Sequence, residues 1–303
     1  YNDSEVAFAT YTGTAAKLLM KQGLNASTLH KLIYNPIMRR GICVGFSKKS
    51  IEDLRGLQLI IIDEFSMVPK NMMDDLFTFN IPIILVGDHA QLPPIGEPNQ
   101  FVNQYHALLD EPIRQALENP IFWAANEVRL GKRIPNGLHG DILFIGGKSN
   151  LDNSWLRPDV KILAGLNKTR HKINTQIAGS VTPMTGHKII FLKNDWKQFI
   201  TNGTIAETTR LKQVNWHTYK ITGVLDDDRR IEEYVAGFQK QSNPRQQFFD
   251  FAFCLTTHKA QGATYDAPGL IIDESSFFRE NRDRWLYTAI TRFTGNHNVA
   301  ILK

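Results

Sequence analysis

The chain has 303 residues, 42% of them hydrophobic, a length typical of two or three globular domains with a large core. It has no run of apolar residues long enough to span a membrane, and its start, YNDSEVAFAT, lacks a signal-peptide pattern, so we expect a cytoplasmic protein without membrane contact. The net charge of +5 favours a polyanionic partner, and the two cysteines, Cys43 and Cys254, lack the spacing of a disulfide framework or zinc site, so we expect both to be reduced.

The first part of the chain alternates strands with helices. Residues 4–24 predict a short strand, a Thr/Gly turn, and a helix with Ala15, Leu18 and Leu19 on one face. Residues 57–64, LQLIIIDE, and 81–88, IPIILVGD, are apolar without alternation, as expected of strands covered on both faces, and a helix near 70–79 separates them. This order predicts a parallel α/β sheet.

Polar side chains follow two of these strands, namely Asp63 and Glu64 after the first and Asp88 and Gln91 after the second. Ligands of parallel sheets bind beyond the carboxyl ends of the strands, where these side chains are expected. An acidic pair there can hold Mg²⁺ and orient a water molecule, but acidic residues are also common in ordinary turns after strands. Spacing alone leaves both interpretations open.

The rest of the chain predicts a second α/β domain with an insertion. Asn119 and Pro120 are typical of a helix start, and a strand and helix are expected at 161–177. Residues 181–240 contain short β-like pieces with turn signals, which predicts a small inserted β-barrel. The α/β pattern then returns, with strands at 251–258 and 268–274, a helix near 282–292 and a last strand, HNVAILK.

Four segments in order carry a resemblance to a known family: DEFSM (63–67), GDHAQLPPIG (87–96), TTHKAQGATYD (256–266) and LYTAITR (286–292). Together they resemble the motif series of superfamily 1 nucleic-acid helicases of the RecD/Dda-like group. The resemblance implies two RecA-like parallel-sheet motor domains with an SH3-like β-barrel inserted in the second. The implied domains are 1–109 for the first motor, 110–180 and 241–303 for the second, and 181–240 for the barrel.

The resemblance also implies roles in ATP hydrolysis. Asp63 would hold Mg²⁺ through water, Glu64 would activate the attacking water, and Gln91 would sense the γ-phosphate. Arg114, in EPIRQALENPI (111–121), and Arg292 would act as arginine fingers from the second domain. The implied nucleotide-binding residues are Asp63, Glu64, Gln91, Arg114, Gln261, Gly262 and Arg292.

The segments ATYTGTAAKLL (9–19) and ASTLHKLI (26–33) are similar to motifs of the family that contact single-stranded DNA. The residues to which the resemblance assigns DNA contacts are Thr12, Thr28, His30, Asn167, Thr257 and His258. Helix capping is the alternative role of Thr12 and Thr28. Aromatic side chains that could stack on DNA bases are Phe101, Tyr105, Trp196 and Trp216, although core packing is the commoner role of such side chains.

Helicases of this group bind the nucleotide phosphates with a glycine-rich loop ending in GK[ST]. We find no such loop here, because TYTGTAAK (10–17) lacks the ending and the glycine spacing. We expect the loop upstream of Tyr1, together with a central strand of the first sheet, and we expect these residues to be inactive without it. A degenerate ATPase that has lost the loop is the alternative.

The function implied by the resemblance is an ATP-dependent DNA helicase that moves 5′ to 3′ on single-stranded DNA and unwinds duplex. Its expected ligands are ATP and Mg²⁺, and its expected partners are single-stranded DNA, junctions of single- and double-stranded DNA, and replication or recombination proteins in a bacterial cell or phage-infected host. The alternatives are a catalytically inactive nucleic-acid-binding subunit and a Pif1-like helicase.

Overall fold

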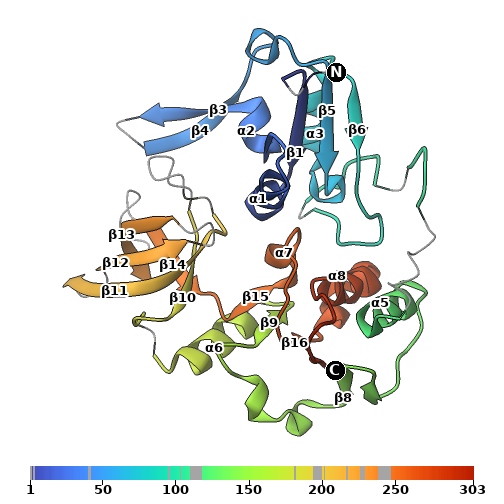
Figure 1. Cartoon of the computed structure of the whole chain (residues 1–303), viewed down its shortest axis with the longest axis vertical. Coiled ribbons are helices and arrows are strands. Elements are labelled where there is room, and N and C mark those ends of the chain that lie inside the picture. Colours follow the sequence, from blue (N-terminus) through green and yellow to red (C-terminus); the bar gives the residue numbers. More distant parts are fainter. Residues whose placement is uncertain are drawn as a thin grey trace. The chain divides into compact units, whose positions relative to one another are not determined.

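The computed structural model describes residues 2, 4–39, 42–94, 96–102, 104–109, 118–180, 182–193, 200, 202–215, 218–225, 229–237 and 247–303. The chain divides into two compact units, Tyr1–Glu111 and Pro112–Lys303, and each has its own parallel sheet (Figure 1). No helix in the described ranges has the length and apolar character needed to cross a membrane.

The first unit has a parallel sheet and a β-hairpin. Its elements in chain order are β1 (Val6–Thr10), α1 (Gly13–Lys21), β2 (Ala26–Thr28), α2 (Leu29–Ile33), β3 (Tyr34–Arg39), β4 (Ile42–Lys48), β5 (Leu59–Asp63), α3 (Lys70–Phe77) and β6 (Ile83–Leu85). The sheet order is β2-β1-β5-β6, and β3 pairs with β4 in a separate antiparallel hairpin, which projects beside α2 in Figure 1.

Alternate residues of the central strands form the core of the first unit. Ile60 and Ile62 of β5 are fully buried, and they pack with Met73 and Leu76 of α3. Burying side chains of this size provides the main stabilisation of such a unit, at about 1.5–3 kcal/mol each. The parallel pairing aligns the strand ends, so all four strands point their carboxyl ends to the same edge.

The second unit has a six-stranded sheet and a barrel. Its elements in chain order are α5 (Pro120–Arg129), β7 (Gly137–His139), β8 (Ile142–Ile145), β9 (Lys161–Ala164), α6 (Asn167–Ala178), β10 (Lys188–Phe191), β11 (Ile205–Asn215), β12 (Thr218–Leu225), β13 (Arg230–Gly237), β14 (Gln247–Phe251), β15 (Cys254–Thr256), α7 (Thr257–Ala260), β16 (Gly269–Ile272), α8 (Arg282–Ile290) and β17 (Val299–Leu302).

The six-stranded sheet has the order β15-β9-β16-β17-β8-β7, and only the β7–β8 pair is antiparallel. Strands β10 to β14 form a closed barrel, which has no free edge for further pairing. Strand β14 completes the barrel, although it lies in the segment 241–303 that the sequence analysis assigned to the second motor domain.

Most predicted elements of both units are present. The strands at 57–64 and 81–88 and the helix near 70–79 are confirmed, as is the helix start at Asn119, whose side chain accepts a hydrogen bond from Ile121 N. The predicted buried face of α1 is wrong in part, because Ala15 and Ala16 are buried while Leu18 is 47% exposed. Of the two cysteines, Cys254 is a free, buried thiol, and the Cys43 side chain lies outside the described residues.

A buried ion pair joins the barrel to helix α6. Arg170 Nη2 lies 2.7 Å from Asp250 Oδ2, both side chains are 3% exposed, and His171 Nδ1 lies 3.8 Å from Asp250 Oδ1. Beside this pair, Asn174 Nδ2 donates to the carbonyl oxygens of Phe251 and Cys254. These contacts fix the crossing from β14 to β15.

We expect Arg170→Met to destabilise the second unit by about 3–5 kcal/mol, because Asp250 would keep a buried, uncompensated charge. The double variant Arg170→Met, Asp250→Leu should recover most of this loss, since it removes both charges. Urea unfolding followed by tryptophan fluorescence reports on this unit alone, because all five tryptophans lie after residue 112. A double variant as unstable as the single one would contradict the electrostatic origin of the loss.

Candidate functional site

The carboxyl edge of the first sheet carries the acidic pair that the sequence singled out. Strand β5 ends at Asp63, and Asp63 Oδ1 accepts a hydrogen bond from the backbone N–H of Glu64 at 2.9 Å. Glu64 has φ 54° and ψ 39°, in the left-handed region that non-glycine residues rarely adopt. Backbone strain of this kind costs about 1–3 kcal/mol and is found mainly at functional sites.

The segment after β6 lies directly against the residue after Glu64. The Phe65 N–H donates to Val86 O at 3.2 Å, and a Cβ on Gly87 would lie 2.8 Å from Phe65 Cδ1. Glycine is therefore required at position 87, since a larger residue would push the two segments apart. Asp88 accepts a hydrogen bond from Ala90 N, and the N–H of the buried Gln91 donates to Asp88 O. Asp63, Glu64, Asp88 and Gln91 thus occupy neighbouring strand ends.

Thr12 and Thr28 both cap helices. Thr12 Oγ1 accepts from Ala15 N at 3.2 Å at the start of α1, and Thr28 Oγ1 accepts from Lys31 N at 3.3 Å at the start of α2. Both threonines therefore have the helix-capping role that the sequence offered as an alternative to DNA contact. The two threonines lie at the same edge, because β1 and β2 are parallel, and each hydroxyl keeps its own O–H to donate.

His30 lies at the base of the β3–β4 hairpin. Its ring centroid is 4.2 Å from that of Phe46 and 4.8 Å from that of Tyr34. Burial lowers the pKa of His30 below 6.5, so the ring is neutral at pH 7. Any contact of His30 with a phosphate would therefore be a hydrogen bond and not an ion pair.

Polar residues also lie at the carboxyl edge of the second sheet. Glu274 follows β16 and its carboxylate accepts hydrogen bonds from Gly165 N, Leu166 N and Thr169 Oγ1, all at the start of α6. A Cβ on Gly165 would lie 2.8 Å from Glu274 Cβ, so glycine is required there too. This arrangement holds the exposed Asn167 at the first position of α6. Sequence reasoning missed Glu274, because its partners lie more than a hundred residues earlier in the chain.

Thr257 and His258 begin helix α7, immediately after β15. Thr257 is fully buried, and its hydroxyl donates to Ala164 O at the end of β9. The ring centroids of His258 and Phe278 lie 5.6 Å apart, and burial lowers the pKa of His258. In this structure Thr257 therefore holds α7 against β9, whereas His258 and the exposed Lys259 are the more accessible side chains of the segment.

Arg292 ties helix α8 to the loop that carries Gln261 and Gly262. Its Nε donates to Thr288 O at 3.1 Å, and its Nη1 donates to Ala263 O at 3.2 Å. Gln261 and Arg292 are 1% and 5% exposed, so this part of the candidate site is packed. A change in the position of Arg292 would be transmitted directly to the loop.

A basic cleft of about 310 Å³ lies where α6, α7 and the barrel meet. We call it the Asn167 cleft, and its lining residues are Asn167, Arg170, Leu192, Lys193, Asn202, Phe248 and Lys259. Lys193 Nζ lies 4.0 Å from the centroid of the Phe248 ring. Partial desolvation of the ammonium groups by the cleft walls lowers the pKa values of Lys193 and Lys259, and the charge of Arg170 lowers that of Lys259 further. Lys259 stands inside the segment TTHKAQGATYD, but no sequence signal marks Arg170 or Lys193 as part of a site.

Several sequence-predicted residues lie elsewhere. Arg114, Trp196 and Trp216 lie outside the described residues. Phe101 packs against Phe77 and the first core, whereas Tyr105 is 59% exposed beside His89.

The tripeptide GKS at 147–149 follows β8 in the second unit and has the ending of a phosphate loop. Such a loop begins with a glycine five residues before the glycine of GKS, and the buried Ile142 occupies that position here.

The described residues contain no group of three or more His, Cys, Asp and Glu side chains that could hold a metal ion alone. Asp63, at the open end of β5, fits the mode in which one carboxylate holds Mg²⁺ that is otherwise bound by water and phosphate oxygens. The first edge is thus suited to a metal that arrives with a nucleotide.

Two parallel α/β units, with a closed barrel in the second, form a fold like that of solved Pif1 helicases. The crystal structure of Pif1 helicase from Bacteroides in complex with ADP-AlF3 and ssDNA matches with a TM-score of 0.58 and 18% identity, and the match covers 99% of this chain and 89% of that one. The predicted fold class is confirmed.

Sequence comparisons point the same way. The family model described as AAA domain matches residues 2–134. The ATP-dependent DNA helicase dda of Enterobacteria phage T4 is 27% identical over 249 residues, which cover 72% of this chain and 52% of the relative. The ATP-dependent DNA helicase Pif1 of Campylobacter jejuni is 23% identical over 328 residues, which cover 82% of this chain and 70% of the relative. The chain is thus similar to the Pif1/RecD/Dda-like helicases of superfamily 1, and it spans about half the length of the phage relative.

We expect Glu64→Gly to stabilise the first unit by about 0.5–1 kcal/mol, because glycine adopts the left-handed conformation without strain. Glu64→Gln keeps the side-chain volume and the strain and should leave stability unchanged. Pulse proteolysis in urea, with the peptide 57–94 quantified by mass spectrometry, measures this unit.

Asn80→Gly is the matched control, since Asn80 also has φ 54° but belongs to a residue type that tolerates it. If Glu64→Gln stabilised the unit as much as Glu64→Gly, the cost would lie in the half-buried carboxylate and not in the backbone.

Proposed function

We propose that the protein containing this chain is an ATP-dependent DNA helicase. It hydrolyses ATP between two RecA-like domains, moves on single-stranded DNA from 5′ to 3′, and opens duplex at junctions of single- and double-stranded DNA. The observation that carries the proposal is the strained backbone of Glu64 beside Asp63, at the carboxyl edge of a sheet with the Pif1-type fold. The sequence similarity to helicases of phage T4 and Campylobacter jejuni supports it.

At the first edge, Asp63 would bind Mg²⁺ through water, and Glu64 would accept the proton of the attacking water. The metal, when bound, neutralises charge that develops on the phosphate oxygens. The left-handed turn aims Glu64 away from the path of the strand, which supports its role at the nucleotide. Gln91, held in the turn after Asp88, would sense the γ-phosphate.

In the second unit, Arg292 would supply positive charge to the γ-phosphate, as Arg114 would. The contact of Arg292 with Ala263 O supports a coupled movement, because an arginine that turns toward a phosphate must release the loop of Gln261 and Gly262. That loop follows α7, which carries His258 and Lys259. Nucleotide state would thus reach residues proposed to contact DNA.

We further propose that the Asn167 cleft binds a phosphate of the DNA strand. Its cations and amides recognise backbone and not base edges, which suits movement along any sequence. Thr12, Thr28, His30 and His258 would add hydrogen bonds, whereas Thr257 would act by positioning α7.

We also propose that a phosphate loop and its strand lie upstream of Tyr1. The support comes from β6, which no strand of the described residues pairs on its outer side. Ile84 of β6 and Val86, which follows it, are 49% and 48% exposed. A parallel strand at this edge would bury them. The same helicase would work with replication or recombination proteins in the cytoplasm of a bacterial cell or phage-infected host.

The alternative is a nucleic-acid-binding subunit without ATPase activity. It would account for the Asn167 cleft, but it gives no reason for the strain at Glu64. Whether the closer kinship is to the Dda or the Pif1 type does not alter the chemistry, because both relatives are named as ATP-dependent DNA helicases.

We expect single-stranded DNA to stimulate ATP hydrolysis by the full native protein, and Glu64→Gln to lower the turnover rate by about 10²–10⁴, since a general base is lost. Nucleotide binding should persist, because the amide keeps the size of the side chain. Phosphate release is the measurement, and Glu97→Gln, which removes an exposed acid from the same unit, is the control. Absence of turnover in the unaltered protein, with DNA binding retained, would favour the binding subunit.

DNA affinity should fall steeply with salt, because phosphate contacts release counterions. Lys259→Ala should lower the slope of log K against log salt by about 0.7 if Lys259 contacts one phosphate of a single strand. Fluorescence anisotropy with labelled oligothymidine measures this. Lys212→Ala removes an exposed charge from β11, outside the Asn167 cleft, and should leave the slope unchanged. Equal slopes for both variants would remove Lys259 from the DNA path.

A further inference from the structure

A second, larger cleft lies at the opposite end of the second sheet. It has a volume of about 690 Å³, within the range of small-molecule sites, and we call it the Lys161 cleft. The sheet contributes residues at the amino ends of its strands, namely Lys161 at the start of β9 and the segments before β15 and β16. The barrel contributes Lys188, Ile205, Glu207 and Leu225. Because the proposed ATP and DNA residues follow the carboxyl ends of the strands, they do not line this cleft.

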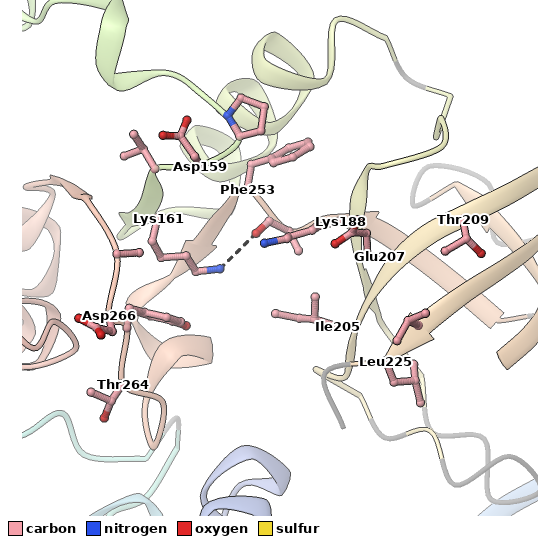
Figure 2. A pocket seen from close by; sticks show the side chains of 16 residues that line it. Asp159, Lys161, Lys188, Ile205, Glu207, Thr209, Leu225, Phe253, Thr264 and Asp266 are labelled. Atoms are coloured by element: carbon pink, nitrogen blue, oxygen red, sulfur yellow. Dashed lines mark hydrogen bonds between the residues drawn. The ribbon is translucent and has the colours of Figure 1, made fainter. Parts of the chain in front are cut away.

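Lys161 projects into the middle of this cleft, as Figure 2 shows. Its Nζ donates to Ala252 O at 3.2 Å and lies 4.9 Å from the centroid of the Tyr265 ring. Among the described residues, no carboxylate forms an ion pair with Lys161. Nearby Cys254 provides no counter-charge either, because burial raises the pKa of its thiol and keeps it neutral.

Lys188 brings a second positive charge to the same place. It stands opposite Glu207 in the β10–β11 register, yet no ion pair joins these two residues. Its side chain points instead toward Lys161 in Figure 2, and its charge contributes to the lowered pKa of Lys161, after the larger effect of burial. The pKa of Lys161 falls to about 8 as a result. The two lysines thus form a local positive centre in the middle of the cleft (Figure 2), which the anionic group of a ligand can neutralise.

The other walls define what kind of anion fits. Phe253, Ile205 and Leu225 are apolar, and the Tyr265 ring lies beside the Lys161 ammonium. Asp159, Glu207 and Asp266 stand at the cleft and are exposed, so they repel a long polyanion such as a nucleic acid strand. A compact molecule that places its anionic group between the lysines and its apolar part on the walls avoids this repulsion.

We propose that the Lys161 cleft binds a small organic anion, an aromatic or aliphatic body that carries one carboxylate or phosphate group. The anionic group lies between Lys161 and Lys188, and the apolar body lies against Tyr265, Phe253 and Ile205. The ligand bridges the sheet and the barrel of the second unit. The proposal does not depend on the helicase assignment, since none of these residues has a role in it.

The low pKa of Lys161 provides a direct probe of this site. Three matched aldehydes differ only in one substituent: para-formylphenyl phosphate, para-formylbenzoate and the neutral para-hydroxymethylbenzaldehyde. When Lys188 holds the anionic group of such a probe, the aldehyde at the other end of the ring can reach Lys161. The neutral Lys161 amine attacks the carbonyl carbon, water leaves, and cyanoborohydride reduces the C=N bond to a stable secondary amine. Peptide mapping at pH 8 by mass spectrometry then gives the extent of labelling at each lysine of the full chain.

We expect one or both anionic aldehydes to label Lys161 at a concentration about tenfold lower than the neutral one needs, since a charge-assisted contact is gained. The better of the two anions identifies the ligand class as a carboxylate or a phosphate. Lys188→Gln should abolish this preference. It also removes a charge that lowers the pKa of Lys161, so labelling by all three aldehydes should fall together. Lys188 is exposed, so the variant should fold.

Two control variants complete the design. Lys161→Arg keeps the charge but cannot form the imine, so the labelled peptide must disappear. Lys212→Gln removes an exposed charge from β11, outside the cleft, and should change nothing. Equal labelling of Lys161 by all three aldehydes, or an anion preference that survives in Lys188→Gln, would overturn the proposal.

Discussion

The parallel register of β1, β5 and β6 is the constraint on which the candidate site depends. Thr10 pairs with Asp63, and Ile62 pairs with Leu85, so the polar residues that follow each strand must emerge at one edge. Shifting one strand by a single residue would turn Ile60 and Ile62 away from the core, at a cost of several kcal/mol. The hydrophobic core therefore sets the relative positions of Asp63, Glu64 and Asp88 before any ligand is present.

The two edges achieve close packing in the same way, with a glycine that leaves room for a neighbouring segment. Gly87 admits Phe65 in the first unit, and Gly165 admits Glu274 in the second. In each case an acidic side chain then accepts backbone N–H groups, Asp63 from Glu64 and Glu274 from Gly165 and Leu166. These bonds satisfy donors that would otherwise be left unpaired at a strand end or helix start. A loop that is already held by such bonds loses less conformational entropy when a ligand binds to it.

Local sequence signals predicted most strands and helices, whereas long-range contacts determine which of their side chains are buried. Apolar runs located β5 and β6, and Asn119 with Pro120 located the start of α5, because each signal lies within the element itself. Leu18 followed the helical period and is nevertheless exposed, since the neighbours that would cover it are not set by its own helix.

The same reasoning explains which features the sequence analysis missed. Glu274 acts on α6 through a contact between segments more than a hundred residues apart, and the barrel strand β14 looks like any other apolar strand until its partners β10 and β13 are known. Thr257 lies in the segment 251–258 that the sequence predicted as a strand, and its hydroxyl is buried against Ala164, a contact that the sequence does not reveal. Motif resemblance marks which positions matter, but only packing shows whether a side chain faces a ligand or its own fold.

Different polar contacts link the barrel to the rest of the second unit at its two clefts. Arg170 lines the Asn167 cleft and bonds to Asp250 of the barrel, so a phosphate bound there competes with Asp250 for the same guanidinium. The Lys161 cleft bridges sheet and barrel from the other end, where the linking contact is the hydrogen bond from Lys161 to Ala252. Residues 250–254 run from one cleft to the other and are anchored midway by Asn174. An anion between Lys161 and Lys188 would thus hold the barrel at one end of the sheet. The proposed DNA phosphate would perturb the contact between Arg170 and Asp250 at the other end. The crossing from β14 to β15 is accordingly the element through which the two clefts would influence each other.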